Sequence, residues 1–231
     1  MALDAVLFDW GGTLTPWRTI TPGEEWASLA AVAAPDRHEE ATAALVSAAE
    51  QVWARSRDEH SSSTIEEICR IAGVPYDDEH LDGYRAFWEP ATVTDADVPE
   101  LLGWLRGEGI KVGVLSNTVW PRAWHEDIFV RDGIDELIDG AVYTSDIAWT
   151  KPAPEAFLAA MEAVGASAPE HCVFVGDRLF DDIYGAKNVG MKAVLVPHSD
   201  IPSGQIGHTE GEPDAVIHSL AELPDVIRSW R

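Results

Sequence analysis

Polar side chains that could take part in catalysis or bind a ligand follow four short apolar runs of this sequence. Asp9 ends the first run and Ser116 ends the second. Asp146 and then Lys151 follow the third run, and Asp177 ends the fourth. Short apolar runs that stop at turn residues are typical of buried parallel strands. Because the carboxyl ends of parallel strands meet at one edge of a sheet, we expect these side chains to lie close together.

Such a cluster is suited to phosphoryl transfer. An aspartate can attack phosphorus and form an aspartyl phosphate, which divides one difficult hydrolysis into two easier steps. Asp9 and Asp177 can share a hard cation that takes oxygen ligands and keeps several waters, which is the behaviour of Mg²⁺. Each residue alone also has an ordinary role as a helix cap or turn former, so the hypothesis depends on their combination.

The elements that must position these groups alternate along the chain. Strand-like runs occupy residues 4–9, 111–117, 140–146, 172–177 and 192–197, with a short sixth run at 214–217. Helical patterns follow at 154–164, closed by Gly165, and at 181–189, closed by Gly190. Strands that alternate with single helices predict an α/β fold with a Rossmann-like parallel sheet. Residues 202–208 are predicted to form a surface loop.

Residues 15–94 break this alternation. They contain no convincing strand, a helical Ala-rich stretch at 39–54, and the helix starts TPGE at Thr21, DRHE at Asp36 and the capping box TIEE at Thr64. We therefore predict a helical cap domain at 15–94, inserted into an α/β core domain of residues 1–14 and 95–231. A second capping box, SLAE at Ser219, predicts a closing helix that runs to Trp230.

The charge balance restricts the partners. Among 231 residues, forty acidic and sixteen basic ones give a formal net charge of −24. This charge repels nucleic acids and acidic lipid surfaces, so neither is an expected partner. An anionic substrate would need local positive charge from a metal, a lysine or oriented backbone amides. The sequence assigns no oligomeric state.

The remaining composition indicates an intracellular protein. Cys69 and Cys172 lack the spacing of a zinc site and are expected to be reduced. We find no basic leader and no run of about 18 apolar residues that could cross a membrane. We therefore expect a cytoplasmic location. The eight histidines show no ligand spacing and are assigned no metal.

Four segments carry a family resemblance. They are VLFDWGGTL, VGVLSNT, TKPAPEAF and VFVGDRLFDDIYGAKNVGM, in that order between residue 5 and about residue 196. They resemble the four motifs of the haloacid dehalogenase superfamily, whose members are mostly magnesium-dependent phosphatases. A helical cap after the first strand is typical of that superfamily.

The resemblance implies roles for individual residues. Asp9 would be the nucleophile, with Ser116 and Lys151 as the other catalytic residues. The phosphoryl group of a small phosphorylated substrate would be held by Trp10, Gly11, Gly12, Thr13, Ser116, Asn117 and Lys151. Mg²⁺ would be bound by Asp9, the carbonyl of Gly11, Asp177 and Asp182, with Asp181 the less certain member of the adjacent pair.

Gly11 departs from the family pattern. Phosphatases of this superfamily have a second aspartate here, which protonates the leaving oxygen and then activates water. General acid–base catalysis contributes about 10²- to 10⁴-fold. A glycine can offer a carbonyl to a metal, but it cannot transfer a proton. Substitutes considered for the missing acid are Thr15, Arg18, Arg55, Arg57 and His60.

Three readings therefore stand beside a phosphatase. Phosphonate hydrolases of the superfamily also have DW followed by a small residue, but they use a cap lysine, and no lysine precedes Lys111. Carbon–halogen hydrolases also lack the second acid. However, the segment GDRLFDD resembles a metal site, and those enzymes do not retain one. A catalytically impaired phosphate-binding protein would not need the nucleophile.

Tryptophans are frequent in the predicted cap. Trp17, Trp26 and Trp53 are three of the ten in the chain. Such residues can form an aromatic wall around a substrate or fill a helical core. The sequence leaves both roles open.

Overall fold

The computed structural model describes residues 3–21, 23–197 and 210–230. The predicted loop at 202–208 lies outside these residues. None of the helices that the structure describes has the length and apolarity needed to cross a membrane.

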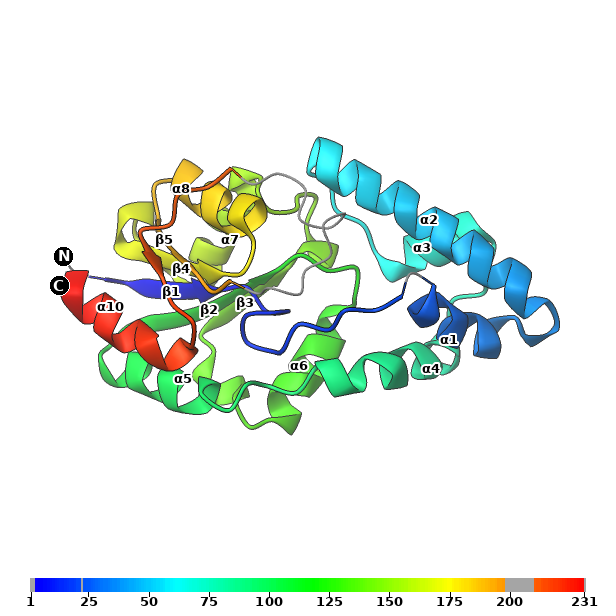
Figure 1. The fold of residues 1–231 in the computed structure, drawn as a ribbon, viewed down its shortest axis with the longest axis horizontal. Helices are drawn as coiled ribbons and strands as arrows, with labels where there is room; N and C mark the ends of the chain where they lie inside the picture. The colour runs from blue at the N-terminus through cyan, green and yellow to red at the C-terminus, as the bar shows by residue number, and fades with distance from the viewer. Residues whose placement is uncertain (1–2, 22, 198–209, 231) are drawn as a thin grey trace.

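A six-stranded parallel sheet forms the centre of the molecule (Figure 1). Its strand order is β3-β2-β1-β4-β5-β6. The strands are β1 (Ala5–Phe8), β2 (Lys111–Ser116), β3 (Gly140–Tyr143), β4 (Cys172–Gly176), β5 (Lys192–Leu195) and β6 (Ala215–Val216). Each begins within two residues of its predicted start, which confirms the α/β class. Because β1 lies between β2 and β4, the first, second and fourth motifs become spatial neighbours.

The strand β1 is buried on both faces. Val6 and Phe8 pack into the apolar cluster that includes α5 (Val98–Gly107) and α10 (Leu223–Trp230). Ala5 and Leu7 pack into the opposite cluster, with α7 (Pro154–Val164) and α8 (Gly185–Asn188). Successive side chains of a strand point to opposite faces, so an unbroken apolar run suits this position. The strand ends at Phe8, and Asp9 follows it while still buried.

The remaining helices belong mostly to the insertion after β1. They are α1 (Glu24–Ala33), α2 (His38–Glu59), α3 (Ile65–Ala72), α4 (Asp78–Trp88) and, within the core, α6 (Arg122–Arg131). The side chain of Thr64 accepts a hydrogen bond from Glu67 N, so the predicted cap of α3 is confirmed. Ser219 likewise forms the predicted capping box, although a 3₁₀ turn precedes α10.

Two predicted helix starts were misplaced. The helix α1 begins at Glu24 and not at Thr21, whose carbonyl accepts the Glu24 amide hydrogen in a preceding turn. The helix α2 begins at His38, because residues 35–37 form a separate 3₁₀ turn. Asp36 therefore lies in that turn and does not cap α2.

The predicted helix at 181–189 was also wrong in form. A π-helical turn, Leu179–Tyr184, comes first, and α8 begins only at Gly185. Within it, Arg178 O accepts hydrogen bonds from the amides of both Asp182 and Ile183. Such wide turns often occur at functional sites. Here the turn buries Asp182 toward the end of the sheet and places Ile183 in the core.

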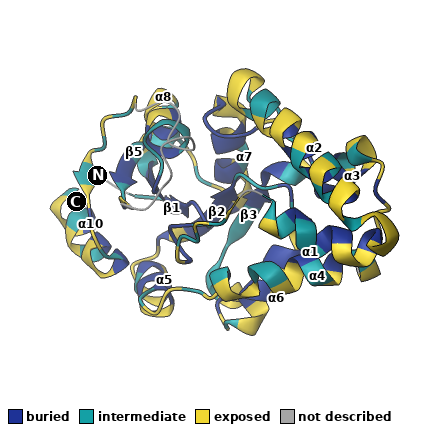
Figure 2. Cartoon of the chain, turned by 45° about the vertical axis from the view of Figure 1, so that its right-hand side comes forward, coloured by how far each residue is buried: buried dark blue, intermediate teal, exposed yellow. Residues whose placement is uncertain are grey.

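The helices α1–α4 pack around an apolar cluster that includes Trp26, Leu45 and Tyr84 and that extends to Val119 and Trp124 of the core. Figure 2 shows each of them with a buried and an exposed face. The helix α5 belongs to the core cluster instead. The insertion leaves and re-enters the core at one place, where Asp95 N donates to Leu14 O at 2.9 Å.

A glycine permits the close packing of α7 on the sheet. A Cβ atom at Gly140 would lie 2.4 Å from the backbone oxygen of Ala163. We expect Gly140→Ala to destabilise the protein by about 1–3 kcal/mol, because the backbone must move to relieve the overlap. A shift in the urea midpoint measures this cost.

The matched control is Gly103→Ala in α5, where a Cβ atom meets nothing within 4 Å. This change should leave stability equal or raise it by up to about 1 kcal/mol, since alanine favours helix. Equal effects at both positions would contradict the packing argument.

Glu25 predicts a pH dependence of stability. Burial in the cap raises its pKa from 4.5 to about 7, although the hydroxyl of Tyr84, which donates to Glu25 Oε2 at 3.1 Å, partly opposes the shift. The unfolded chain loses this proton near pH 4.5, whereas the folded protein keeps it up to about pH 7. Folded stability therefore falls as pH rises across this window.

Glu25→Gln removes that titration and retains an acceptor for Tyr84. The stability of the variant relative to wild type should rise by about 2–3 kcal/mol between pH 5 and pH 8. Urea denaturation at the two pH values measures it. A difference that does not change with pH would show that Glu25 is not held protonated in the fold.

Candidate active site

The first and third motifs meet through a buried ion pair. Lys151 Nζ lies 2.5 Å from Asp9 Oδ1 and 2.7 Å from Asp182 Oδ1. Asp9 follows β1, and its amide donates to Val175 O of β4. The predicted convergence of these residues is therefore present in the fold. The lysine contacts two carboxylates that lie 173 residues apart in the chain (Asp9 to Asp182).

The charge of Lys151 is held by its surroundings. Its side chain is 2% exposed, so burial by itself would lower its pKa. Asp182 and Asp9 oppose this effect, and the net result is a pKa raised above its ordinary value. A buried cation with two carboxylates in hydrogen-bond contact remains charged at neutral pH. Lys151 is therefore a fixed positive charge between Asp9 and Asp182.

Three carboxylates gather beside this lysine. Asp9, Asp177 and Asp182 each offer an oxygen within 4.8 Å of the others. Burial raises the pKa of Asp182 to about 7, with Asp9 adding to the effect and Lys151 opposing it. Burial and the charges of Asp9 and Asp182 also raise the pKa of Asp177. One lysine does not neutralise three buried acids, so the cluster favours a further cation.

One oxygen of this cluster lacks a hydrogen bond. Asp177 Oδ2 is buried and accepts none from the residues that the structure describes, with Arg178 Nε at 3.4 Å. The donor set consists of hard oxygens, which suits a divalent cation such as Mg²⁺. The buried aspartates thus fit a metal site in number, type and spacing.

The turn after β1 has a defined hydrogen-bond pattern. The amides of Thr13, Leu14 and Thr15 donate to Trp10 O, and Gly12 N donates to Thr15 O. Within the described residues, the amides of Trp10 and Gly11 make no backbone hydrogen bond. The latter two are therefore the donors of this turn that remain for a phosphoryl oxygen.

Glycine is required at position 12. Its φ is +89°, and a Cβ atom there would lie 3.0 Å from Asp177 Oδ2 and 3.3 Å from the Trp17 ring. Gly11 differs, since a Cβ atom at this position meets nothing within 4 Å. Among residues 3–21, 23–197 and 210–230, no side chain therefore fills the place where the family pattern has its second acid.

The second motif lies on the other side of β1. Ser116 is the buried last residue of β2. Asn117 Nδ2 donates to Lys151 O at 3.1 Å, and its Oδ1 accepts from Lys151 N at 2.8 Å. The amide side chain therefore fixes the backbone that carries the lysine. Contacts of Ser116 and Asn117 with phosphate remain predictions.

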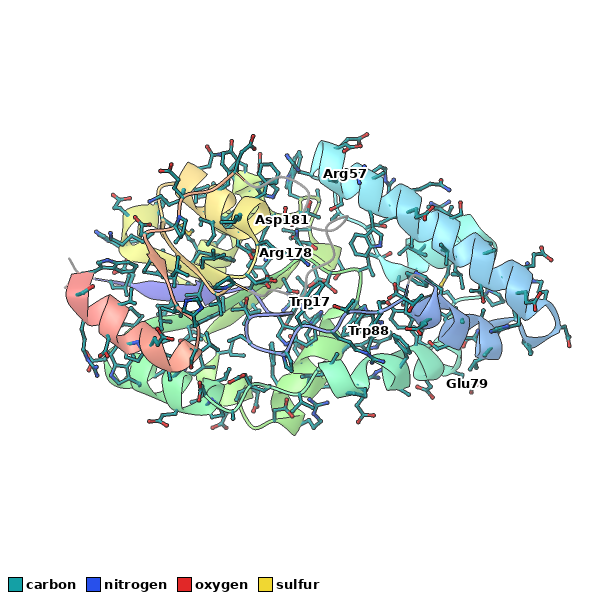
Figure 3. The ribbon with its side chains drawn as sticks, in the orientation of Figure 1. Trp17, Arg57, Glu79, Trp88, Arg178 and Asp181 are labelled. Carbon is teal, nitrogen blue, oxygen red and sulfur yellow. The ribbon has the colours of Figure 1, made fainter. Side chains whose placement is uncertain are left out.

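Aromatic side chains flank the carboxylates. The Arg178 guanidinium stacks over Trp17 at 4.5 Å, and both labels lie close together in Figure 3. Trp26 is instead buried in the cap core, and Trp53 is 45% exposed on α2. Of Trp17, Trp26 and Trp53, only Trp17 is shown beside Asp177 in the described structure. Sequence reasoning missed Arg178, although a cation directly after Asp177 was a readable signal.

The five proposed substitutes for the missing acid have different surroundings. Arg55 pairs with Glu67, and Arg57 pairs with Asp58. The guanidinium of Arg18 donates to Phe87 O, and Thr15 Oγ1 donates to Trp10 O at 3.4 Å. His60 follows α2 and reaches the segment that precedes Lys151.

A cavity of about 340 Å³ lies between α4 and α6. It is lined by residues that include Trp88, Trp120 and Trp124. None of the three clustered aspartates lines it. Its lining residue Trp120 packs edge-on against Trp10, with the two ring centroids 5.7 Å apart. We place the chemistry at the carboxylates, because a cavity without a nucleophile offers only binding.

Two curated relatives share part of the sequence. The chain is 31% identical over 125 residues to a glyceraldehyde 3-phosphate phosphatase of Methanothermobacter thermautotrophicus, covering 53% of this chain and 54% of the relative. It is 31% identical over 131 residues to the pyrophosphatase PpaX of Halalkalibacterium halodurans, covering 56% and 58%. The chain thus spans about half the length of the relatives it matches.

Solved structures share the fold over almost the whole chain. A HAD phosphatase from Thermococcus onnurineus superposes with a TM-score of 0.68 at 24% identity, covering 97% of this chain and 98% of that one. An L-2-haloacid dehalogenase from Xanthobacter autotrophicus gives 0.64 at 21% identity, covering 99% and 100%. At such identities the likeness establishes the fold alone.

The family model for haloacid dehalogenase-like hydrolases matches residues 3–190. That span contains β1, the helical insertion and the buried cluster of Asp9, Lys151, Asp177 and Asp182. The chain therefore belongs to the haloacid dehalogenase-like hydrolases.

Proposed function

We propose that this protein is a phosphatase that hydrolyses a small phosphate monoester through an aspartyl phosphate on Asp9. The observation that carries the proposal is the contact of Lys151 Nζ with both Asp9 and Asp182, beside the third carboxylate of Asp177. This arrangement combines a nucleophile, a fixed cation and a candidate metal site. A pentavalent transition state with spread negative charge needs such a setting.

The residues have separate tasks in this proposal. Asp9 attacks phosphorus, and the bond from phosphorus to the leaving oxygen breaks. The amides of Trp10 and Gly11 donate to phosphoryl oxygens, while Lys151 balances the developing charge. Water then hydrolyses the aspartyl phosphate and releases inorganic phosphate.

Asp9, Asp177, Asp182 and the carbonyl of Gly11 would hold Mg²⁺. When bound, the cation neutralises phosphoryl oxygens and so lowers the repulsion between substrate and carboxylates. The Asp177 oxygen without a hydrogen bond supports this assignment, and so do the pKa values of Asp177 and Asp182, which burial and then the neighbouring carboxylates raise.

Residues 15–94 form the cap domain in this proposal. Two facts support these bounds: α1–α4 share one apolar cluster, which meets the core at Val119 and Trp124, and Asp95 N donates a hydrogen bond to Leu14 O where the insertion begins and ends. The cap would exclude water and select the substrate.

The phosphatase relatives favour a small phosphorylated substrate. One is named for glyceraldehyde 3-phosphate and another for pyrophosphate. Both substrates are compact and highly anionic. We therefore propose a compact phosphate ester, held by Lys151 and the metal against the overall charge of −24.

Gly11 keeps a carbon–halogen hydrolase as the second candidate, since such an enzyme does not need an acid at this position. The buried acids argue against it. A third carboxylate near the nucleophile repels a carboxylate substrate unless a cation intervenes. Halide release from 2-chloropropionate tests this alternative directly.

The proposed function predicts the behaviour of a substrate panel. Wild-type protein with Mg²⁺ should release phosphate from at least one compact phosphate ester, and a chelator should abolish the release. Asp9→Asn should lower kcat by on the order of 10³-fold or more, because the nucleophile is lost. Phosphate release measured with a colorimetric assay gives both numbers.

A retained fold in Asp9→Asn, checked by circular dichroism, makes the comparison valid. Halide release without phosphate release would replace the phosphatase by the second candidate. Tight phosphate binding with no turnover in wild type would instead identify a binding protein.

Metal binding is testable without turnover. Mg²⁺ at a hundred times its dissociation constant should raise the Tm of wild type by roughly 5–10 °C, because the ion binds only the folded state. Asp177→Asn should remove most of this rise. Asp181→Asn is the matched control and should retain it, since Asp181 is not among the three clustered acids. Equal loss in both variants would contradict the assigned ligands.

A further inference from the structure

We propose that His60 donates the proton to the leaving oxygen, in place of the acid that Gly11 lacks. This inference rests on the proposed phosphatase function. It assigns the proton transfer to a cap residue that becomes part of the site only through the contact between cap and core.

The backbone of His60 is fixed next to Lys151. Thr150 N donates to His60 O at 2.9 Å, and Ser62 N donates to Ala148 O at 3.1 Å. Ser61 and Trp149 form an antiparallel bridge between these two bonds. The cap segment at 60–62 therefore runs along the residues that lead directly into the catalytic lysine.

The side chain of His60 lies on the site side of this contact. Its ring centroid is 6.3 Å from that of Phe180, within the π-helical turn that carries Asp182. The imidazole therefore approaches the turn that follows β4 and carries Asp182.

The imidazole also has an unused nitrogen. His60 Nδ1 is buried and has no hydrogen-bond partner among the residues that the structure describes. The Arg55 and Arg57 side chains, by contrast, are each engaged in an ion pair. Histidine is moreover the side chain whose ordinary chemistry suits proton transfer near neutral pH.

The backbone of His60 adopts a costly conformation. Its φ of 52° is the one positive value outside glycine in the described residues. Non-glycine residues in this region are strained and cluster at functional sites. Glycine or asparagine would adopt the conformation more readily, yet the chain has a histidine here.

Space for the substrate lies where the usual acid would be. Among the described residues, no atom lies within 4 Å of a Cβ atom built at Gly11. In this proposal the leaving group extends over Gly11 toward the cap, and its oxygen meets the His60 imidazole.

The chemical step balances. Asp9 Oδ forms a bond to phosphorus as the bond from phosphorus to the leaving oxygen breaks, and that oxygen takes a proton from the imidazolium of His60. In the second step water attacks the aspartyl phosphate and gives a proton to the neutral imidazole. The products are the alcohol and inorganic phosphate, with His60 and Asp9 regenerated.

The test compares leaving groups. Because kcat/KM reports on the step that releases the leaving group, His60→Asn should lower kcat/KM for the best alkyl phosphate of the panel by about 10²- to 10⁴-fold. For 4-nitrophenyl phosphate, whose leaving group needs no proton, kcat/KM should change less than about threefold. The kcat for 4-nitrophenyl phosphate should still fall, and the phosphorylated protein should accumulate and be visible by intact mass.

His218→Asn is the matched control, because His218 is exposed after the edge strand β6. It should leave both substrates unchanged. Equal losses of kcat/KM on alkyl and aryl phosphates in His60→Asn would overturn the inference and indicate a structural role, and so would an unchanged alkyl rate. Absence of hydrolysis in wild type would overturn the proposed function itself.

Two further variants guard against misfolding of His60→Asn. His60→Gly relieves the backbone strain. Added imidazole should raise the alkyl phosphatase activity of this variant at least tenfold over its activity without imidazole. Gly11→Asp, for which the structure provides space, should rescue the alkyl rate when combined with His60→Asn. Failure of both rescues in folded proteins would contradict a proton-transfer role.

Discussion

The structure depends on one buried cation among buried acids. Lys151 contacts Asp9 and Asp182 at the same time, and Asp177 lies within reach of both. Removing a partner from such a pair typically costs 3–5 kcal/mol, because a buried charge is left alone. Asn117, the π-helical turn and the close approach of β1 to β4 all serve to bring these four side chains together. The contacts that hold this part of the core together are therefore also the contacts that form the candidate site.

Glycines make the close approach of these carboxylates to the backbone possible. A Cβ atom at Gly176 would lie 2.4 Å from Asp182 Cγ, and one at Gly12 would lie 3.0 Å from Asp177 Oδ2. Glycine at these two positions lets carboxylates approach the backbone where side chains would otherwise be. At Gly11, by contrast, the described residues leave the space open. Gly12 and Gly176 are therefore needed for packing, whereas Gly11 leaves room for a ligand.

Much of the arrangement was predictable from the sequence. The strands were readable because each is a short apolar run that ends in a turn, and parallel order then places Asp9 and Asp177 on adjacent strands. The start of α1, the form of residues 179–184 and the engagement of Asn117 were not predicted. The last two depend on contacts between residues distant in sequence, Lys151 with Asp182 and Asn117 with Lys151, which local patterns do not contain. The position of His60 was unreadable for the same reason.

The hydrogen bonds between residues 60–62 and 148–150 join the insertion to the segment that leads into Lys151. A swing of the insertion away from the sheet would break these bonds and loosen the backbone that leads into Lys151, so the support of the lysine is coupled to the position of the cap.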